Sequence, residues 1–330
     1  MKKVITLIRL IIATVKIICR NMVWSVIRVP YGAFYCIVLL RNRSTHYVVI
    51  CDHIGDFLIT MGYLEAYRKE KELKHITICT TQKFVPFLLD NKFLFDDNLV
   101  LNSKRLYRIL MLSSTNFGDH IVKKLGNLTI INPTNAFTEE GFVYLARFPH
   151  VTFGDCIKYG CLELQKDSEH RPLVIKTEQL VSPEVYPKGR TVLLCPFART
   201  TKLNAMPLFA VIAEKLIAEG FIVLTNIAIE SDPVVAGTVG IHCSLHEVFQ
   251  LVEHGGFVVG TRSGILDWLM YAECKMVAIY SEADIYFDFF DLLSLPQTKA
   301  DVMQFRQQSY GVENVNNIIS FFTEERQNEC

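Results

Sequence analysis

Three short polar turns hold most of the side chains that could do chemistry, and each follows an apolar run. The first turn, CDHIGD at 51–56, places the carboxylate of Asp56 beside a glycine. Burying a carboxylate without a partner is costly, so an acid directly after an apolar run suggests a functional position. The second turn, CPFARTTK at 195–202, carries two cations, and the third, GTRSG at 260–264, places an arginine between glycines. The turns therefore offer one candidate proton acceptor and three candidate anion-binding cations.

The elements around these turns alternate between short strands and helices. The first series pairs the strands HYVVIC and HITICT with the helix FLITMGYLEAYRKEKEL between them. The second series alternates the strands TVLLC, FIVLTNI, GFVVGT and MVAIYS with three helices, MPLFAVIAEKLIAEG, SLHEVFQLVEHG and SGILDWLMYAECK. Short strands separated by helices indicate parallel β-α-β units.

A polar, proline-bearing stretch at 167–190 separates the two series. The sequence therefore predicts an α/β protein with two Rossmann-like parallel-sheet domains, at 44–180 and 190–305, and a final helix within 306–330. Such sheets bind ligands at the carboxyl ends of their strands. All three turns lie at such ends, so we expect them to line a cleft between two facing domains.

The three turns, in this order, resemble those of the GT-B glycosyltransferases, and most of all the ADP-heptose:lipopolysaccharide heptosyltransferases of glycosyltransferase family 9. HIGDFLITMGYLEAYRK resembles the family's opening Gly-Asp turn and helix. CPFARTTK resembles its His-Pro-Gly-Ala…Lys turn, and SLHEVFQLVEHGGFVVGTRSGILDWLMY resembles the stretch that ends in Gly-Asn-Asp-Ser-Gly-x-x-His. The resemblance covers roughly residues 46–285. It implies a GT-B fold and an inverting transfer of a sugar from a nucleotide-diphosphate donor.

The sequence departs from the family pattern at five positions. Cys195 and Phe197 stand where the family has His and Gly. Arg262 replaces an Asp, and Asp267 replaces a His. Gly62 stands where a proline is common. These changes gather where the donor would be recognised, so the resemblance does not identify the donor.

By resemblance, Asp56 is the general base that takes the proton of the acceptor hydroxyl. An alcohol that attacks an anomeric carbon must lose its proton, and a carboxylate can accept it. Gly55 would let the acceptor approach the backbone closely, and His53 either lines the site or only fills the turn. The alternative is that Asp56 caps the helix that follows it.

The resemblance also assigns Lys202 to the leaving diphosphate, where a fixed cation stabilises the growing negative charge. Arg199 either assists it or belongs to a solvated basic loop. In the third turn, the amides of Ser263, Gly264 and Ile265 would face an anion at a helix start.

Further donor contacts are expected from side chains near the second and third turns. Thr261 is part of the third turn, and Arg262 could bind phosphate in a bidentate manner. Asp267 either contacts sugar hydroxyls or has a surface or capping role, and Ser263 could simply cap the helix. Glu230 and Asn226 compete for the nucleotide ribose.

The sequence predicts no metal and no cofactor beyond the nucleotide-sugar substrate. No D-x-D motif lies between apolar strands. His242, Cys243, His246 and His254 are close in sequence, but His242 and His246 straddle a predicted loop-to-helix junction. Zinc is therefore a weaker interpretation than ordinary core or surface histidines.

Composition sets further bounds on function. The chain has 330 residues, of which 50% are hydrophobic, and its formal net charge is zero, which argues against a general nucleic-acid binder. Its ten cysteines form no C-x-x-C pair, which is typical of a reducing compartment. Residues 1–43 hold eight cations and no acid: Lys2, Lys3, Arg9, Lys16, Arg20, Arg28, Arg41 and Arg43.

This basic segment predicts an amphipathic helix at a membrane surface. Lys2, Arg9, Lys16 and Arg20 fall on one helical face, and aliphatic residues cover the rest. Charges interrupt every stretch before it reaches the roughly 18–20 residues of a spanning helix. Cations would face anionic headgroups and aliphatics the acyl region. The alternative is a helix that packs on the body of the protein.

We therefore expect an inverting, metal-independent glycosyltransferase with a lipid-linked saccharide acceptor. It would be peripheral to the cytoplasmic face of the plasma membrane, held on the anionic surface by residues 1–43, with no nucleic-acid partner. Two alternatives remain open: a degenerate GT-B domain that is a non-catalytic partner in polysaccharide assembly, and a nucleotide-sugar 2-epimerase.

Overall fold

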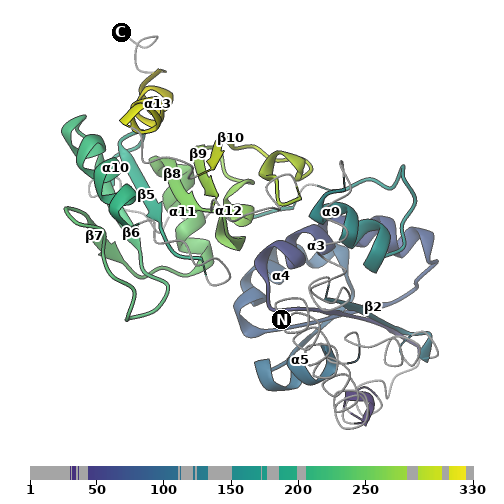
Figure 1. The fold of residues 1–330 in the computed structure, drawn as a ribbon. Helices are drawn as coiled ribbons and strands as arrows, with labels where there is room; N and C mark the ends of the chain where they lie inside the picture. The colour runs from purple at the N-terminus through teal and green to yellow at the C-terminus, as the bar shows by residue number, and fades with distance from the viewer. Residues whose placement is uncertain are drawn as a thin grey trace, which may run out of the picture. The chain divides into compact units, whose positions relative to one another are not determined.

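A computed structural model describes most of the chain as two compact units (Figure 1). The described residues are 30, 32–34, 36, 44–110, 112, 122, 125–132, 151–171, 173–176, 186–198, 206–280, 289–306 and 312–324. The first unit comprises residues 1–52, 63–148 and 155–169, and the second comprises 53–62, 149–154 and 170–330.

The first unit contains a four-stranded parallel sheet in the order β3-β2-β1-β4. Its strands are β1 (His46–Ile50), β2 (Ile76–Thr80), β3 (Asp97–Val100) and β4 (Leu128–Ile131). Its connections are α3 (Ile54–Glu70), η2 (Gln82–Phe84), α4 (Val85–Asp90), η3 (Lys92–Leu94) and α5 (Ser103–Leu110), with η5 (Cys156–Cys161) later in the chain. The short helix α9 (Phe153–Asp155) lies at the boundary, and its first two residues belong to the second unit. Residues 54–62 of α3 belong to the second unit, and residues 63–70 belong to the first.

The end of the basic N-terminal segment packs into the core of the first unit. Cys36 is buried with side chains of β1, β2 and α5, and Ala33 packs against the same cluster. A Cβ on Gly32 would lie 2.7 Å from the carbonyl oxygen of Arg108 in α5. Most of the helix predicted over residues 1–43 lies outside the described residues. Within the described ranges, no helix is long and apolar enough to cross a membrane.

The second unit contains a six-stranded parallel sheet in the order β10-β9-β8-β5-β6-β7. Its strands are β5 (Thr191–Cys195), β6 (Ile222–Asn226), β7 (Val239–Ile241), β8 (Gly256–Thr261), β9 (Lys275–Tyr280) and β10 (Asp301–Arg306). Its other elements are α10 (Met206–Ala218), α11 (Leu245–Gly255), α12 (Gly264–Leu269), η6 (Leu292–Ser294) and α13 (Val312–Thr323). Two parallel sheets with helices confirm the predicted α/β class and its two Rossmann-like sheets.

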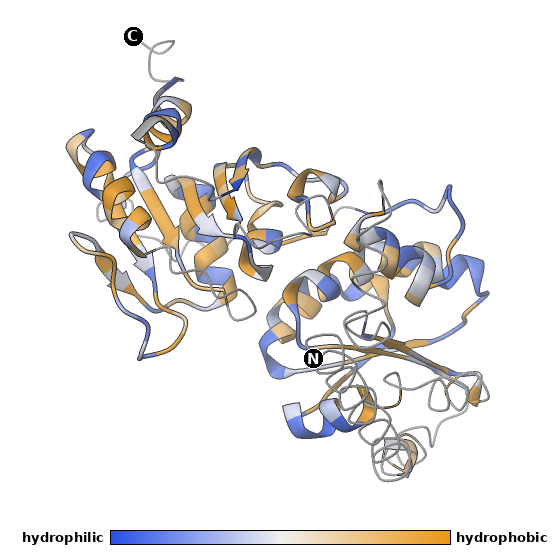
Figure 2. Ribbon diagram, viewed as in Figure 1, coloured by the Kyte–Doolittle hydropathy of each residue, from blue (hydrophilic) through white to orange (hydrophobic). Residues whose placement is uncertain are grey.

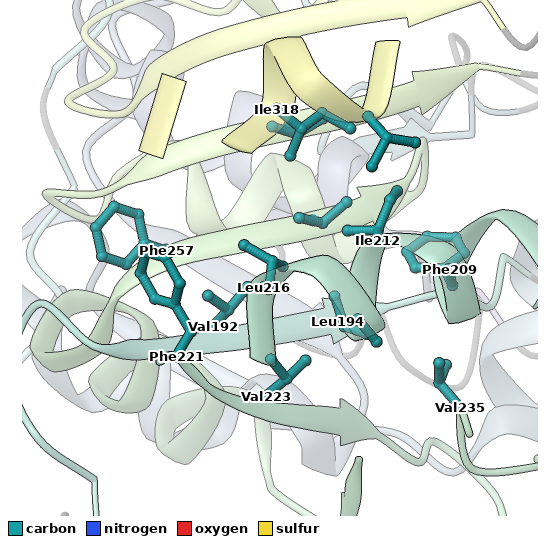
Figure 3. Close-up of a cluster of buried hydrophobic side chains, with 14 of the residues drawn as sticks. Val192, Leu194, Phe209, Ile212, Leu216, Phe221, Val223, Val235, Phe257 and Ile318 are labelled. Atoms are coloured by element: carbon teal, nitrogen blue, oxygen red, sulfur yellow. The ribbon is translucent and has the colours of Figure 1, made fainter. Parts of the chain in front are cut away.

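Helices cover both faces of this sheet. Side chains of α10 and α13 share one buried cluster with alternate residues of β5, β6, β8 and β9, among them Val192 and Leu194 (Figure 3). Strand order reverses direction after β7, so right-handed connections place α11 and α12 on the opposite face. Because both faces are covered, the strands read as nearly continuous apolar runs rather than alternating ones.

Local signals in the sequence set the ends of these helices. Ser244 and Glu247 form a capping box at the start of α11, and Gly256 ends it in the left-handed conformation with φ 89°. Gly220, with φ 80°, follows α10 in the same way, as its position in the sequence predicts.

A buried histidine explains the glycine in the middle of α3. A Cβ at Gly62 would overlap the imidazole of His170, and the amide of Arg171 donates to the carbonyl of Gly62 at 2.8 Å. His170 is 5% exposed, and burial lowers its pKa to about 4, so the ring is neutral at physiological pH. Gly62, which stands where the family commonly has proline, therefore lies where the neutral imidazole of His170 packs against the backbone of α3.

We expect Gly62→Ala to destabilise the protein, although alanine normally favours a helix over glycine. Overlap with His170 should lower the free energy of unfolding by about 1–3 kcal/mol in urea titrations. Gly154→Ala in α9 is the control, because its nearest neighbour is Thr152 Oγ1 at 3.6 Å. The double variant with His170→Ala should lose less than the sum of the single losses. A Gly62→Ala protein that is more stable than wild type would contradict this packing.

Candidate functional site

The turn between β1 and α3 holds the acid that the sequence singled out. Asp56 lies in the first turn of α3 and is only 2% exposed. The carbonyl of His53 accepts the hydrogen bond of Phe57 N, so His53, and not Asp56, is the residue that opens the helix. The Nδ1 atom of His53 lies 3.4 Å from Asp56 Oδ2, and the imidazole remains largely exposed.

The first turn of α3 lies against α12, and both belong to the second unit. A Cβ on Gly55 would come within 2.5 Å of Asp267 Oδ2, and one on Gly264 would lie 3.2 Å from the Cβ of Ile54. Gly55 and Gly264 are therefore the residues that permit this approach. The structure thus brings the first and third predicted turns together.

Asp267 forms a buried ion pair with Arg262. The Arg262 Nη2 atom lies 2.7 Å from Asp267 Oδ1, and both side chains are about one-tenth exposed. The guanidinium also donates to the carbonyls of Phe290 at 2.9 Å and Ser263 at 3.1 Å. Its planar fork therefore has acceptors on three nitrogens, an arrangement that lysine could not reproduce.

Burial raises the pKa of Asp267, and the nearby charge of Asp56 raises it further, while Arg262 lowers it. Asp56 is therefore close enough for its charge to act on Asp267. Two carboxyl groups and one guanidinium therefore lie in this buried corner. Removal of Arg262 would leave Asp267 buried without the cation that favours its charged form.

The pair also accounts for two of the departures from the family pattern. The resemblance places an Asp at position 262 and a His at position 267, whereas this chain has Arg262 and Asp267. In this chain the side chains at the two positions form an ion pair with each other. A phosphate role for Arg262 and a sugar role for Asp267 stay predictions, and either contact would compete with this pair.

The second and third turns meet where the strand order of the second sheet changes direction. The hydroxyl of Thr261 donates to the carbonyl of Pro196 at 2.9 Å. A Cβ on Gly260 would lie 3.2 Å from that of Cys195, so the two turns are in close contact. This is the switch point between β5 and β8, where doubly wound sheets bind nucleotides.

Asn226 lies at the end of β6 beside this switch point. It is 8% exposed, and its side chain hydrogen-bonds the thiol of Cys195. Burial raises the pKa of Cys195 to about 12, so this thiol is neutral and unsuited to nucleophilic chemistry. Glu230 is exposed in the turn beyond β6, and the ribose role of either residue stays a prediction.

Ser263 precedes α12 with an extended backbone, but its side chain makes no capping hydrogen bond. Its Oγ atom is buried and has no hydrogen-bond partner among the described residues. The interpretation of Ser263 as a side-chain cap is therefore wrong. Ile265 and Gly264 follow it and are half-buried.

The structure does not describe the two cations of the second turn. Arg199 and Lys202 lie within 199–205, outside the described residues. Their expected contact with a diphosphate stays a prediction.

The described residues include one group whose side chains are able to hold a metal ion. The ligand atoms of Cys51, His53 and Asp56 lie within 4.8 Å of one another. This C-x-H-x-x-D group lies outside the residues weighed from the sequence for zinc, which were His242, Cys243, His246 and His254. His254 hydrogen-bonds the carbonyl of Tyr186 at 2.8 Å, and His246 stacks near Trp268. Thiolate and imidazole donors would suit a zinc-like cation better than magnesium.

Comparison with known proteins identifies the fold. No protein-family model and no curated protein matches the sequence. Among solved structures, ADP-heptose LPS heptosyltransferase II of E. coli is similar with a TM-score of 0.52 at 14% identity, over 86% of this chain and 100% of that chain. A glycosyl transferase family 9 protein of Veillonella parvula has a TM-score of 0.51 at 13% identity, over 79% and 86% of the two chains.

A third similar structure is the dodecameric iron-containing heptosyltransferase TibC of enterotoxigenic E. coli, in complex with ADP-D-β-D-heptose. Its TM-score is 0.52 at 14% identity, over 85% of this chain and 77% of that chain. This chain has the GT-B fold. Identities this low establish the fold alone, so the chemistry has to be argued from the residues of this chain.

The buried pair gives a stability prediction. Arg262→Met should lower the free energy of unfolding by about 3–5 kcal/mol, because Asp267 would remain buried without its cation. The double variant Arg262→Met, Asp267→Leu should recover most of this loss. Lys299→Met is the control, because it breaks an exposed pair with Glu273 that should contribute under about 1 kcal/mol. Equal losses for Arg262→Met and Lys299→Met in urea titrations would refute the importance of the pair.

Proposed function

We propose that this protein is an inverting glycosyltransferase that moves a sugar from a nucleotide-diphosphate donor to a lipid-linked saccharide. The observation that carries the proposal is the position of Asp56, a buried acid in the first turn of α3, next to Gly55, which lies against Asp267 of α12. The GT-B fold supports it, because many enzymes of this fold transfer sugars.

The reaction assigns a task to each group. As the acceptor oxygen attacks the anomeric carbon, its proton passes to the carboxylate of Asp56. The bond between the anomeric carbon and the diphosphate oxygen breaks on the opposite face, so the configuration inverts. The diphosphate leaves with its electron pair, and Lys202, assisted by Arg199, stabilises the added negative charge. No metal ion is needed in this scheme.

We place the nucleotide at the switch point of the second sheet. Asn226 and Thr261 lie at the ends of their strands there, and the buried Oγ of Ser263 would find a partner in a bound phosphate. ADP-heptose is named for the heptosyltransferases of similar structure. The changes at 195, 197, 262 and 267 make another nucleotide-sugar equally compatible with this chain.

We further propose that residues 1–43 hold the enzyme on the anionic cytoplasmic face of the plasma membrane. Their eight cations without a single acid support this. A lipid-linked acceptor would then be present in the same plane, which raises its effective concentration at the site.

Substitution of the proposed base tests the mechanism. Asp56→Asn should lower kcat by about 10²–10⁴-fold while the donor still binds, since the amide cannot accept the proton. Asp52→Asn is the matched control from the same turn, because Asp52 bonds Thr81 and Lys83 instead. Transfer by Asp56→Asn at the wild-type rate under saturating donor would exclude this mechanism.

Donor binding separates an enzyme from a degenerate scaffold. A nucleoside diphosphate sugar at 100 times its Kd should stabilise the protein by about 2.7 kcal/mol and raise Tm by a few degrees. Ser263→Ala should weaken this stabilisation, whereas Ser294→Ala, distant in sequence, should not. If none of a panel of nucleotide-sugars raises Tm, the chain is a non-catalytic partner. Conversion of the donor without any acceptor would instead identify an epimerase.

A further inference from the structure

Helix α5 of the first unit exposes a face of cations and one aromatic ring. Lys104 and Arg105 are exposed, and Tyr107 is 50% exposed. The side chains of Lys104 and Arg105 have no ion pair within the described ranges. The helix contains no acid, and its first residues appear hydrophilic in Figure 2. Its opposite face, formed by Leu106, Ile109 and Leu110, is buried in the core.

The end of the basic N-terminal segment packs on this same helix. Gly32 approaches the carbonyl of Arg108, and Ala33 and Cys36 join the cluster that contains the buried face of α5. Phe34 is 61% exposed beside them in sequence. The chain therefore enters the described part of the first unit beside α5, directly after residues 1–29, which carry six cations and no acid in the sequence.

We propose that the exposed face of α5, together with Phe34, is a docking surface for an anionic lipid bilayer. Charge complementarity identifies the occupant, because Lys104 and Arg105 continue the acid-free cationic series of residues 1–29 onto the folded unit. Tyrosine, as at position 107, is favoured at the level of the headgroups, and phenylalanine, as at position 34, is common on the apolar side of interfacial helices. The inference rests on the proposed membrane association and names a second, folded part of the contact.

A membrane contact on the folded helix α5 would constrain the orientation of the first unit, which the N-terminal segment alone would not do. A chain attached only through a terminal segment can present any face to the bilayer. A second contact, on the folded helix α5, would fix the orientation of the first unit, and hence the direction from which an acceptor reaches it. Two attachment points also give a higher overall affinity than either alone, because binding of the first raises the effective concentration of the membrane at the second.

The test uses the full chain and vesicles of two compositions, phosphatidylcholine alone and phosphatidylcholine with phosphatidylglycerol at about 3:1. Lys104→Glu, Arg105→Glu should bind the anionic vesicles at least about tenfold more weakly than wild type in co-sedimentation. Lys188→Glu, Arg190→Glu is the matched control, because these residues are exposed in the second unit and the net charge changes equally. The control should bind within about threefold of wild type.

The salt dependence of binding and a charge-neutral variant provide two further tests. The difference between the variants should shrink at about 1 M salt, where charges are screened within a few ångströms. If the charge-reversed variant does not fold, the charge-neutral variant Lys104→Gln, Arg105→Gln replaces it. This variant should keep the wild-type Tm and bind anionic vesicles more weakly than wild type, with a smaller loss than the charge reversal would give. Equal binding by the α5 variant and the control would overturn the proposal, as would binding of wild type to both vesicles alike.

The outcome is separable from the proposed catalysis. The α5 variant should retain stabilisation by a nucleotide-sugar in the absence of lipid, because α5 is not part of the proposed donor site. Weak lipid binding with intact donor binding supports the docking surface. Failure of every donor to bind would contradict the glycosyltransferase and leave the vesicle result unaffected.

Discussion

The buried ion pair between Arg262 and Asp267 is the constraint on which the candidate site depends. One oxygen of Asp267 meets the guanidinium and the other meets the backbone at Gly55. The pair thereby joins the β8–α12 turn to the turn that carries Asp56. Charges buried at this depth are tolerated only when they are paired and hydrogen-bonded, which fixes the geometry of every group around them.

Sheet topology explains why each polar turn lies at the uncovered end of a strand. In the first sheet β1 lies between β2 and β4, and in the second β5 lies between β6 and β8. In each sheet the strand order changes direction beside the strand that feeds a predicted motif. The helices that follow such strands diverge to opposite faces and leave the strand ends uncovered. Polar residues there can remain accessible to a ligand although the strands themselves are buried.

Much of the fold could be predicted from the sequence, because its signals are local. Apolar runs such as HYVVIC and TVLLC gave strands, and the Ser244–Glu247 box and Gly220 gave helix ends. The strand orders could not be predicted in this way, since they depend on which strands pair.

The candidate site was less accessible to such reasoning. The positions of Asp56 and Thr261 at strand ends followed from the pattern, but the contact between Arg262 and Asp267 did not. Each residue was assigned to a ligand separately, although opposite charges five residues apart at a helix start were a usable signal. The overlap of Gly62 with His170 joins residues 108 positions apart, and no local pattern reports it.

The distribution of thiols offers a practical handle on the arrangement of the two units. Of the cysteines in the described ranges, six are buried, whereas Cys161 in the first unit and Cys243 in the second are partly accessible. Once Cys19 and Cys330 are replaced, a maleimide dye should therefore react at one native position in each unit. Energy transfer between the two dyes would then report how the separation of the units changes when a ligand is added, with no cysteine introduced by engineering.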